Sequence, residues 1–115
     1  MKTLSLTWLG QSGFILRSEG LAFACDLYLS DYCTKISRLD HTRKMPIPVM
    51  PETLDYIDHY LITHPHADHF DPETIGAILK AGGKTVFLCP PSCTEKINKY
   101  LPDFSDRFKL LTSGK

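Results

Sequence analysis

The chain has 115 residues, with 13 Lys and Arg against 13 Asp and Glu, and a sequence isoelectric point of about 6.9. This length predicts one domain at most, and a net charge of zero gives no overall electrostatic case for binding nucleic acid or a membrane surface. No apolar run reaches about 18 residues, and the start of the chain lacks the continuous apolar core of a signal peptide, so a cytoplasmic location is expected.

The first part of the chain is predicted to form an antiparallel meander of three strands. Apolar and polar residues alternate from Leu4 onwards, and glycine-containing turns separate the apolar segments. The predicted strands cover residues 4–9, 14–17 and 21–25. Residues 27–51 then have no clear period and contain three prolines, so this segment is predicted to be a long loop without regular structure.

The remainder of the chain alternates predicted strands and helices. Residues 60–63, 85–88 and 108–111 are the predicted strands. Residues 73–80 have the apolar spacing of an amphipathic helix, and residues 91–101 are predicted to form a second helix with Pro91 near its first turn. Asp71 stands before Pro72 and Glu73, which predicts a helix N-cap rather than a metal ligand.

The four cysteines show no C-x-x-C pair. Two of them end apolar segments, so buried free thiols are the favoured interpretation and a structural zinc site is the alternative. They are Cys25, Cys33, Cys89 and Cys93.

The most informative segment is residues 63–71, which contains His64, His66, Asp68 and His69. In an extended segment His64 and His66 point the same way, and a tight turn after them can bring Asp68 and His69 towards a second position nearby. Imidazole and carboxylate ligands suit zinc, and they also serve manganese or iron. The segment follows a predicted strand and precedes a predicted helix, which is where open α/β sheets usually hold ligands.

The spacing His64-x-His66-x-Asp68-His69 resembles the signature of the metallo-β-lactamase superfamily. Residues 8–20, the strand end at Cys25 and Asp26, and residues 57–71 are similar to its L-ascorbate-6-phosphate lactonase branch. The resemblance implies an α/β fold, the amino-terminal half of an αββα sandwich. Residues 1–115 would then form a partial domain, with the later ligands of the superfamily in a second half. That half would lie outside this chain, come from another chain, or be missing from a degenerate gene.

The resemblance also implies a metal-dependent hydrolase. His64 and His66 would hold one ion and Asp68 and His69 a second, with Zn²⁺ as the default metal and Mn²⁺ as the alternative. A metal-bound hydroxide would attack the substrate, and Asp68 would also orient it or accept its proton. Asp26 is either an acid that supports the metal ligands or a turn residue at the end of a strand.

The expected substrate is a small molecule, either a phosphorylated sugar lactone or a similar ester. The alternatives are a phosphodiesterase or nuclease of the same superfamily, and a non-catalytic metal-binding fragment. Little activity is expected of the chain by itself. Its apolar strands and helices would leave a sheet face exposed, which predicts a homo-oligomer or a complementing second half as the protein partner.

Two further sets of residues complete the expectations. His59 is expected to be structural, because it precedes a predicted strand. The loop 27–51 has more basic than acidic residues, so it is expected to line the substrate entrance and meet a substrate phosphate; a solvated loop is the alternative. The basic residues are Lys35, Arg38, Arg43 and Lys44, with His41 beside them.

Overall fold

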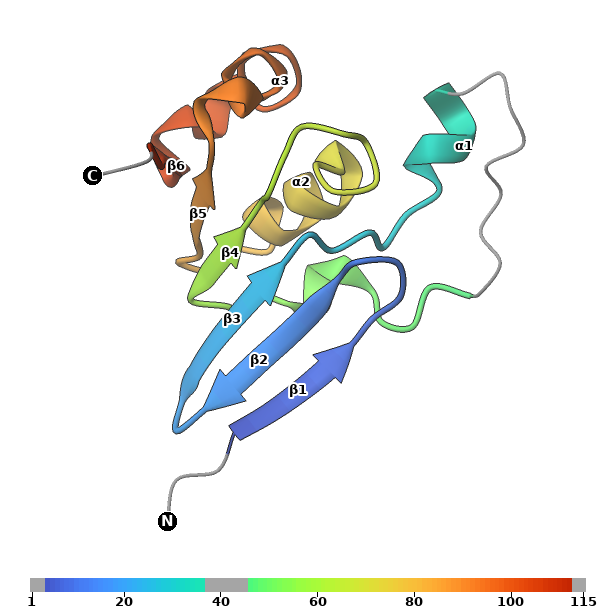
Figure 1. Cartoon of the computed structure of the whole chain (residues 1–115), viewed down its shortest axis with the longest axis vertical. Coiled ribbons are helices and arrows are strands. Elements are labelled where there is room, and N and C mark those ends of the chain that lie inside the picture. The colour runs from blue at the N-terminus through green and yellow to red at the C-terminus, as the bar shows by residue number, and fades with distance from the viewer. Residues whose placement is uncertain (1–3, 37–45, 113–115) are drawn as a thin grey trace.

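The strands of the chain form one six-stranded sheet in the order in which they occur in the sequence (Figure 1). The computed structural model describes residues 4–36 and 46–112. Strands β1 to β3 pair antiparallel, and β3 to β6 pair parallel, which confirms the predicted meander followed by strand–helix units. The strands are β1 (Leu4–Trp8), β2 (Phe14–Ser18), β3 (Leu21–Cys25), β4 (His59–Leu61), β5 (Val86–Cys89) and β6 (Phe108–Leu110).

Within these described ranges, three short α-helices accompany the sheet: α1 (Tyr32–Ile36), α2 (Pro72–Lys80) and α3 (Thr94–Tyr100). The carboxylate of Asp71 accepts a hydrogen bond from the backbone N–H of Glu73, so the predicted N-cap of α2 is confirmed. The predicted helix over residues 91–101 is divided, because a 3-10 turn, η2 (Pro91–Cys93), precedes α3. Two more 3-10 turns are η1 (Pro51–Thr53) and η3 (Pro102–Arg107). No helix in the described part of the chain is long and apolar enough to cross a membrane.

The prediction that residues 27–51 lack regular structure is wrong at both ends of the segment. Residues 32–36 form α1, and Pro51 begins η1. A helix of five residues is too short for a 3.6-residue period to stand out in the sequence, which is why the pattern missed it. The start of the segment is also firmly packed, because Leu27, Tyr28 and Leu29 are all buried. Residues 37–45 lie outside the described part of the chain.

The strand that delivers the histidine-rich segment begins one residue earlier than predicted. His59 therefore lies inside β4 rather than before it. Pairing continues past the strand, since the N–H of Ile62 donates to the carbonyl of Leu88 at 2.8 Å. At Thr63 the backbone N–H instead donates to a side chain, the carboxylate of Asp26.

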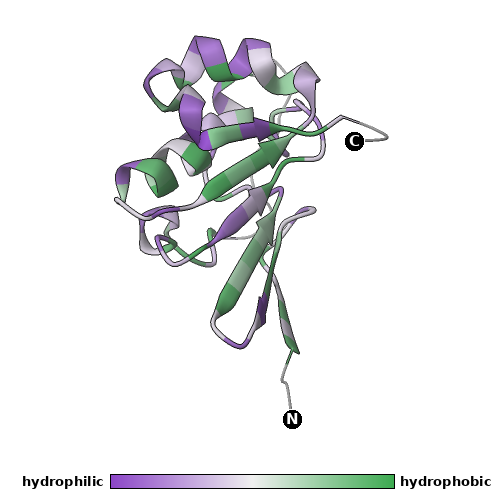
Figure 2. Cartoon of the chain, turned by 90° about the vertical axis from the view of Figure 1, so that its left-hand side faces the viewer, coloured by the Kyte–Doolittle hydropathy of each residue, from purple (hydrophilic) through white to green (hydrophobic). Residues whose placement is uncertain are grey.

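The helices that the structure describes cover one face of the sheet. The strand register places Ile15, Ala24, Tyr60 and Phe87 on that face, where they are buried beneath the apolar side of α2. The opposite face carries Leu6, Leu16 and Phe23 and has no described helix over it. In Figure 2 the strands nearest the N-terminus are largely apolar and extend away from the helices.

Candidate metal centre

The candidate site lies at the carboxyl ends of two neighbouring parallel strands. β3 ends at Cys25 and is followed by Asp26, and β4 ends at Leu61 and leads into the histidine-rich loop. The N–H of Asp26 donates to the carbonyl of Leu61 at 3.0 Å, which keeps the two strand ends together. The parallel pairing therefore brings residues far apart in the sequence to one edge of the sheet, as the sequence predicts for His64 and its neighbours.

The side chain of Asp26 is buried where these two strands end. One carboxylate oxygen accepts the backbone N–H of Thr63 at 2.8 Å. The other oxygen accepts the hydroxyl of Thr63 at 2.6 Å and lies 2.8 Å from Nδ1 of His69. The positive φ of Asp26 turns the chain sharply at this point. Asp26 is therefore a turn residue at a strand end and also a direct partner of one predicted ligand.

The contact between Asp26 and His69 has a chemical consequence for the imidazole. A carboxylate accepts the proton on Nδ1, which leaves Nε2 as the atom with a free lone pair. Nε2 of His69 lies 3.7 Å from Oδ1 of Asp68. Asp26 thus fixes one nitrogen of the His69 ring and leaves Nε2 on the side where Asp68 lies.

The three histidines of the motif gather in one cluster. The ring centroids of His64 and His66 are 4.6 Å apart, and those of His64 and His69 are 4.0 Å apart. The N–H groups of His69 and Phe70 both donate to the carbonyl of His66, so the predicted tight turn is confirmed. Residues 64–66 bend rather than extend, and the expectation that strand alternation aligns His64 with His66 is wrong. The bend, not the alternation, brings their rings together.

The chemistry of this donor set fits a divalent metal. It offers imidazole nitrogens, a half-exposed carboxylate on Asp68, and a buried carboxylate behind His69. Among the described residues, no three His, Cys, Asp or Glu side chains converge closely enough to hold an ion in the present conformation. The rings instead pack on each other, and side-chain rotation in the loop is needed to aim their nitrogens at a common point.

Two contacts that sequence reasoning missed support the loop and its neighbour. The ammonium group of Lys96 in α3 donates to the carbonyl of Pro65, between His64 and His66. A Cβ on Gly13 would lie 3.0 Å from the carbonyl oxygen of Asp26, so only glycine lets the β1–β2 loop approach so closely. Neither contact leaves a local signal in the sequence, because each joins residues more than ten positions apart.

A cavity of about 570 Å³ opens beside the histidine loop. It lies between the β1–β2 loop, the start of the segment after β3, helix α1, and the turn of the histidine loop. The predicted ligands His66 and Asp68 contribute to its wall. The other described residues that line it are Gln11, Tyr28, Cys33, Ile36 and Ala67.

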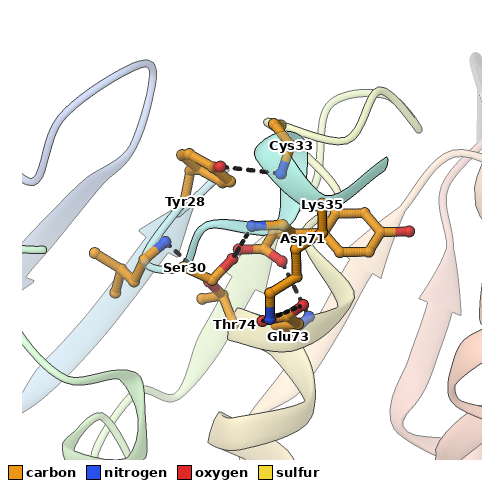
Figure 3. Close-up of polar contacts among 9 residues, drawn as sticks. Tyr28, Ser30, Cys33, Lys35, Asp71, Glu73 and Thr74 are labelled. Carbon is orange, nitrogen blue, oxygen red and sulfur yellow. Dashed lines mark hydrogen bonds and ion pairs between the residues drawn. The ribbon is translucent and has the colours of Figure 1, made fainter. Parts of the chain in front are cut away.

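A buried polar cluster holds the α1 side of this cavity in place (Figure 3). The carboxylate of Asp71 accepts hydrogen bonds from the hydroxyls of Ser30 at 2.6 Å and Thr74 at 2.5 Å. The hydroxyl of Thr74 in turn accepts the N–H of Leu29 at 2.9 Å. Burial raises the pKa of the Asp71 carboxyl above its usual value, while these hydrogen bonds oppose that rise. Asp71 therefore links the start of α2 to the segment that precedes α1.

The basic residues expected at the substrate entrance divide into two groups. The ammonium group of Lys35 lies 2.9 Å from the carboxylate of Glu73, so this lysine is paired within the protein (Figure 3). The remaining expected residues, Arg38, His41, Arg43 and Lys44, lie outside the described part of the chain.

The cysteines are free thiols, as predicted. Cys25, Cys89 and Cys93 are buried and Cys33 is half-buried. Burial raises the pKa of Cys25 to about 11 and that of Cys89 to about 12, so these thiols stay protonated at neutral pH.

Comparison with known proteins reveals distant relatives over part of the chain. No protein-family model matches it. Over 76 residues, 66% of the chain, it is 32% identical to uncharacterized proteins of Mycobacterium tuberculosis and Mycobacterium bovis. Over 87 residues, 76% of the chain, it is 28% identical to N-acyl-phosphatidylethanolamine-hydrolyzing phospholipase D 1 of Caenorhabditis elegans.

The aligned segments make up 20% of the mycobacterial proteins and 24% of the worm protein, so the chain spans about a fifth to a quarter of the length of these relatives. The chain is thus distantly homologous to a hydrolase over part of its length.

Proposed function

We propose that this chain carries the metal-binding segment of a metal-dependent hydrolase of the metallo-β-lactamase superfamily. The observation that carries the proposal is the cluster of His64, His66 and His69 at one sheet edge, with the buried carboxylate of Asp26 against His69. The spacing of the motif and the similarity to a lipid-hydrolysing phospholipase support it independently.

The residues of the loop would bind up to two metal ions. His64 and His66 would hold one ion, and Asp68 and His69 the other, with Zn²⁺ as the default and Mn²⁺ as the alternative. When bound, the metal would lower the pKa of water to about 7 and so make a nucleophile available at neutral pH. Asp26 would keep His69 in the required tautomer. Asp68 borders the cavity and is partly exposed, so it could also orient the water and accept its proton.

The bond that this site would cleave is an ester of a small molecule. The resemblance to the lactonase branch favours the ring ester of a phosphorylated sugar lactone. A second candidate is a phosphodiester, which the similarity to the phospholipase of Caenorhabditis elegans favours. Both reactions need the same water activation, so the substrate and not the metal chemistry distinguishes them.

Metal content provides the test of this proposal. The chain is equilibrated with Zn²⁺ or Mn²⁺, dialysed, and analysed for bound metal, alongside His66→Ala and the control His59→Ala. His59 is exposed on β4 and lies outside the cluster. We expect His66→Ala to lose bound metal and His59→Ala to retain it. Unchanged stoichiometry in His66→Ala would exclude the assignment.

Turnover provides a separate measurement. Only two protein ligands in the loop are assigned to each ion, and positions with three or four ligands hold zinc more firmly and more rigidly. We therefore expect little hydrolysis of lactone or phosphodiester substrates by the 115-residue chain. Robust turnover that His64→Ala abolishes would show that no further ligands are required.

A further inference from the structure

We propose that the cavity beside the histidine loop binds an uncharged, largely apolar part of the substrate, such as the acyl chain of an ester. This inference rests on the proposed function, because it concerns the substrate of the same site. It differs from the phosphate-binding entrance expected from the sequence.

The described part of the cavity wall combines apolar surface with few charged side chains. Among the lining residues that the structure describes, none is Lys or Arg, and the one carboxylate is Asp68. Tyr28, Ile36 and Ala67 supply apolar surface. The volume of about 570 Å³ lies within the range of small-molecule sites, which are mostly apolar with a few polar groups.

The polar groups on the α1 side of the cavity are already engaged in hydrogen bonds. The hydroxyl of Tyr28 accepts the backbone N–H of Cys33 at 3.0 Å (Figure 3). Lys35 in α1, which does not line the cavity, pairs with Glu73. An alkyl chain placed here requires no hydrogen-bond donor from the wall.

Ile36 gives a second reason to expect an apolar occupant. Its side chain is 54% exposed although it is large and apolar, and it lies at the end of α1 on the cavity wall. A ligand over Ile36 would remove apolar surface from water, which is favourable. The contacts of Asp71 and Lys35 hold this helix in place without any ligand.

The location of the cavity suits the acyl side of a scissile bond. His66 and Asp68, assigned to different ions, both line its wall. An acyl chain in the cavity would therefore place its carbonyl carbon beside the metal positions. Two lysines, Lys96 and Lys99, line a separate hollow of about 260 Å³ next to Pro65.

Fluorescence of Trp8 can report on occupancy of the cavity. Trp8 is the only tryptophan in the sequence, and its indole N–H donates to the carbonyl of Gln11 at 2.8 Å. Gln11 lines the cavity, so a ligand there should perturb the indole. The half-buried thiol of Cys33 provides a second reporter, because a bound ligand should slow its alkylation by iodoacetamide.

The experiment titrates the metal-free chain with hexanamide, with acetamide as the ligand lacking the chain, and with inorganic phosphate. We expect saturable binding of hexanamide, at least tenfold weaker binding of acetamide and phosphate, and protection of Cys33 by hexanamide alone. No metal is present in this titration, so a lack of hexanamide binding would contradict the cavity proposal alone. The metal-content measurement tests the proposed function separately.

Two variants locate the bound ligand. Ile36→Asp places a charge in the cavity wall, and Leu21→Asp places the same charge on the uncovered sheet face, where Leu21 is also exposed. We expect Ile36→Asp to weaken hexanamide binding about tenfold and Leu21→Asp to leave it unchanged. Both side chains are exposed, so both variants should fold, and circular dichroism checks this. Binding of phosphate in preference to hexanamide, or greater loss in Leu21→Asp, would overturn the proposal.

Discussion

Asp26 connects the end of β3 to the loop that carries the predicted metal ligands. Its carboxylate accepts two hydrogen bonds from Thr63 and contacts Nδ1 of His69. A carboxylate that accepts the Nδ1 proton makes the opposite nitrogen a better metal ligand, and loss of such a partner typically costs ten- to a hundredfold in metal affinity. The same side chain also fixes the first residue of the loop, so its effect is both electronic and geometric.

We predict that Asp26→Asn weakens zinc binding by about ten- to a hundredfold. Asparagine has the same size but carries no charge to favour the required tautomer of His69. The measurement is competition with a chromophoric zinc chelator. Asp58→Asn is the matched control, because Asp58 lies at the other end of β4 and accepts the N–H of Ala22 at 2.7 Å. Equal losses in both variants would show a general effect on the sheet rather than a role for Asp26 at the site.

The residues of the site were predictable from the sequence only where they lie close together in the chain. The H-x-H-x-D-H spacing identifies the four candidate ligands as one group, and the structure clusters the three histidines. For Asp26 the sequence left a supporting acid and a turn residue equally open, and the structure places this residue in a turn, with its carboxylate against the predicted ligand His69. The contacts of Gly13 and Lys96 could not be predicted, because they depend on tertiary packing across β1–β2 and α3.

At the scale of elements, the start of α2 is joined to α1 and to the segment before α1 by contacts of unequal strength. Lys35 and Glu73 form an exposed ion pair, which contributes little because water screens it. Asp71 is fully enclosed and accepts hydrogen bonds from Ser30, Thr74 and the N–H of Glu73. Removal of a buried acceptor leaves its donors unpaired, which costs more than a lost surface contact.

We predict that Asp71→Ala lowers the free energy of unfolding by about 2–4 kcal/mol, from loss of the N-cap and of the buried hydrogen bonds. Lys35→Ala is the control and should change stability little, because its ion pair is exposed. Urea denaturation of the two variants and the parent chain measures both effects. A small change in Asp71→Ala would show that the cluster does not hold the α1 segment to α2.

Element prediction succeeded where short turns separate alternating strands, as in β1 to β3, because glycine turns and alternation are local signals. It failed for α1, whose five residues cannot display a full helical period. The three-residue strand β4 was misplaced by one residue at its start and two at its end. There, the Asp26 side chain replaces a backbone partner at Thr63, and no property of Thr63 itself marks this change.

At the scale of the whole molecule, the sheet has two apolar faces, and residues 4–36 and 46–112 place helices on only one of them. Leu4, Leu6, Trp8 and Leu21 are each at least 60% exposed on the other face. Monomeric proteins rarely expose contiguous apolar patches larger than a few hundred Å². We propose that another sheet covers this face, either in a second copy of the chain or in the complementing half of an αββα sandwich, which the resemblance to the superfamily implies.

We predict that the isolated chain self-associates through this face. Two sheets that pack face to face would bury the exposed leucines and Trp8 from both copies, and a zero net charge provides no repulsion against association. Leu6→Lys combined with Leu21→Lys should weaken association at least tenfold, since each copy would bury two unpaired charges. Leu110→Lys is the control, because Leu110 is half-exposed on β6 at the opposite edge of the sheet. Sedimentation velocity over a concentration series measures the effect.

A parent chain that stays monomeric at high concentration would rule out the second copy as the cover and leave the complementing half as the remaining candidate. That half could then be recognised by its ability to bind the parent chain and its failure to bind the double variant.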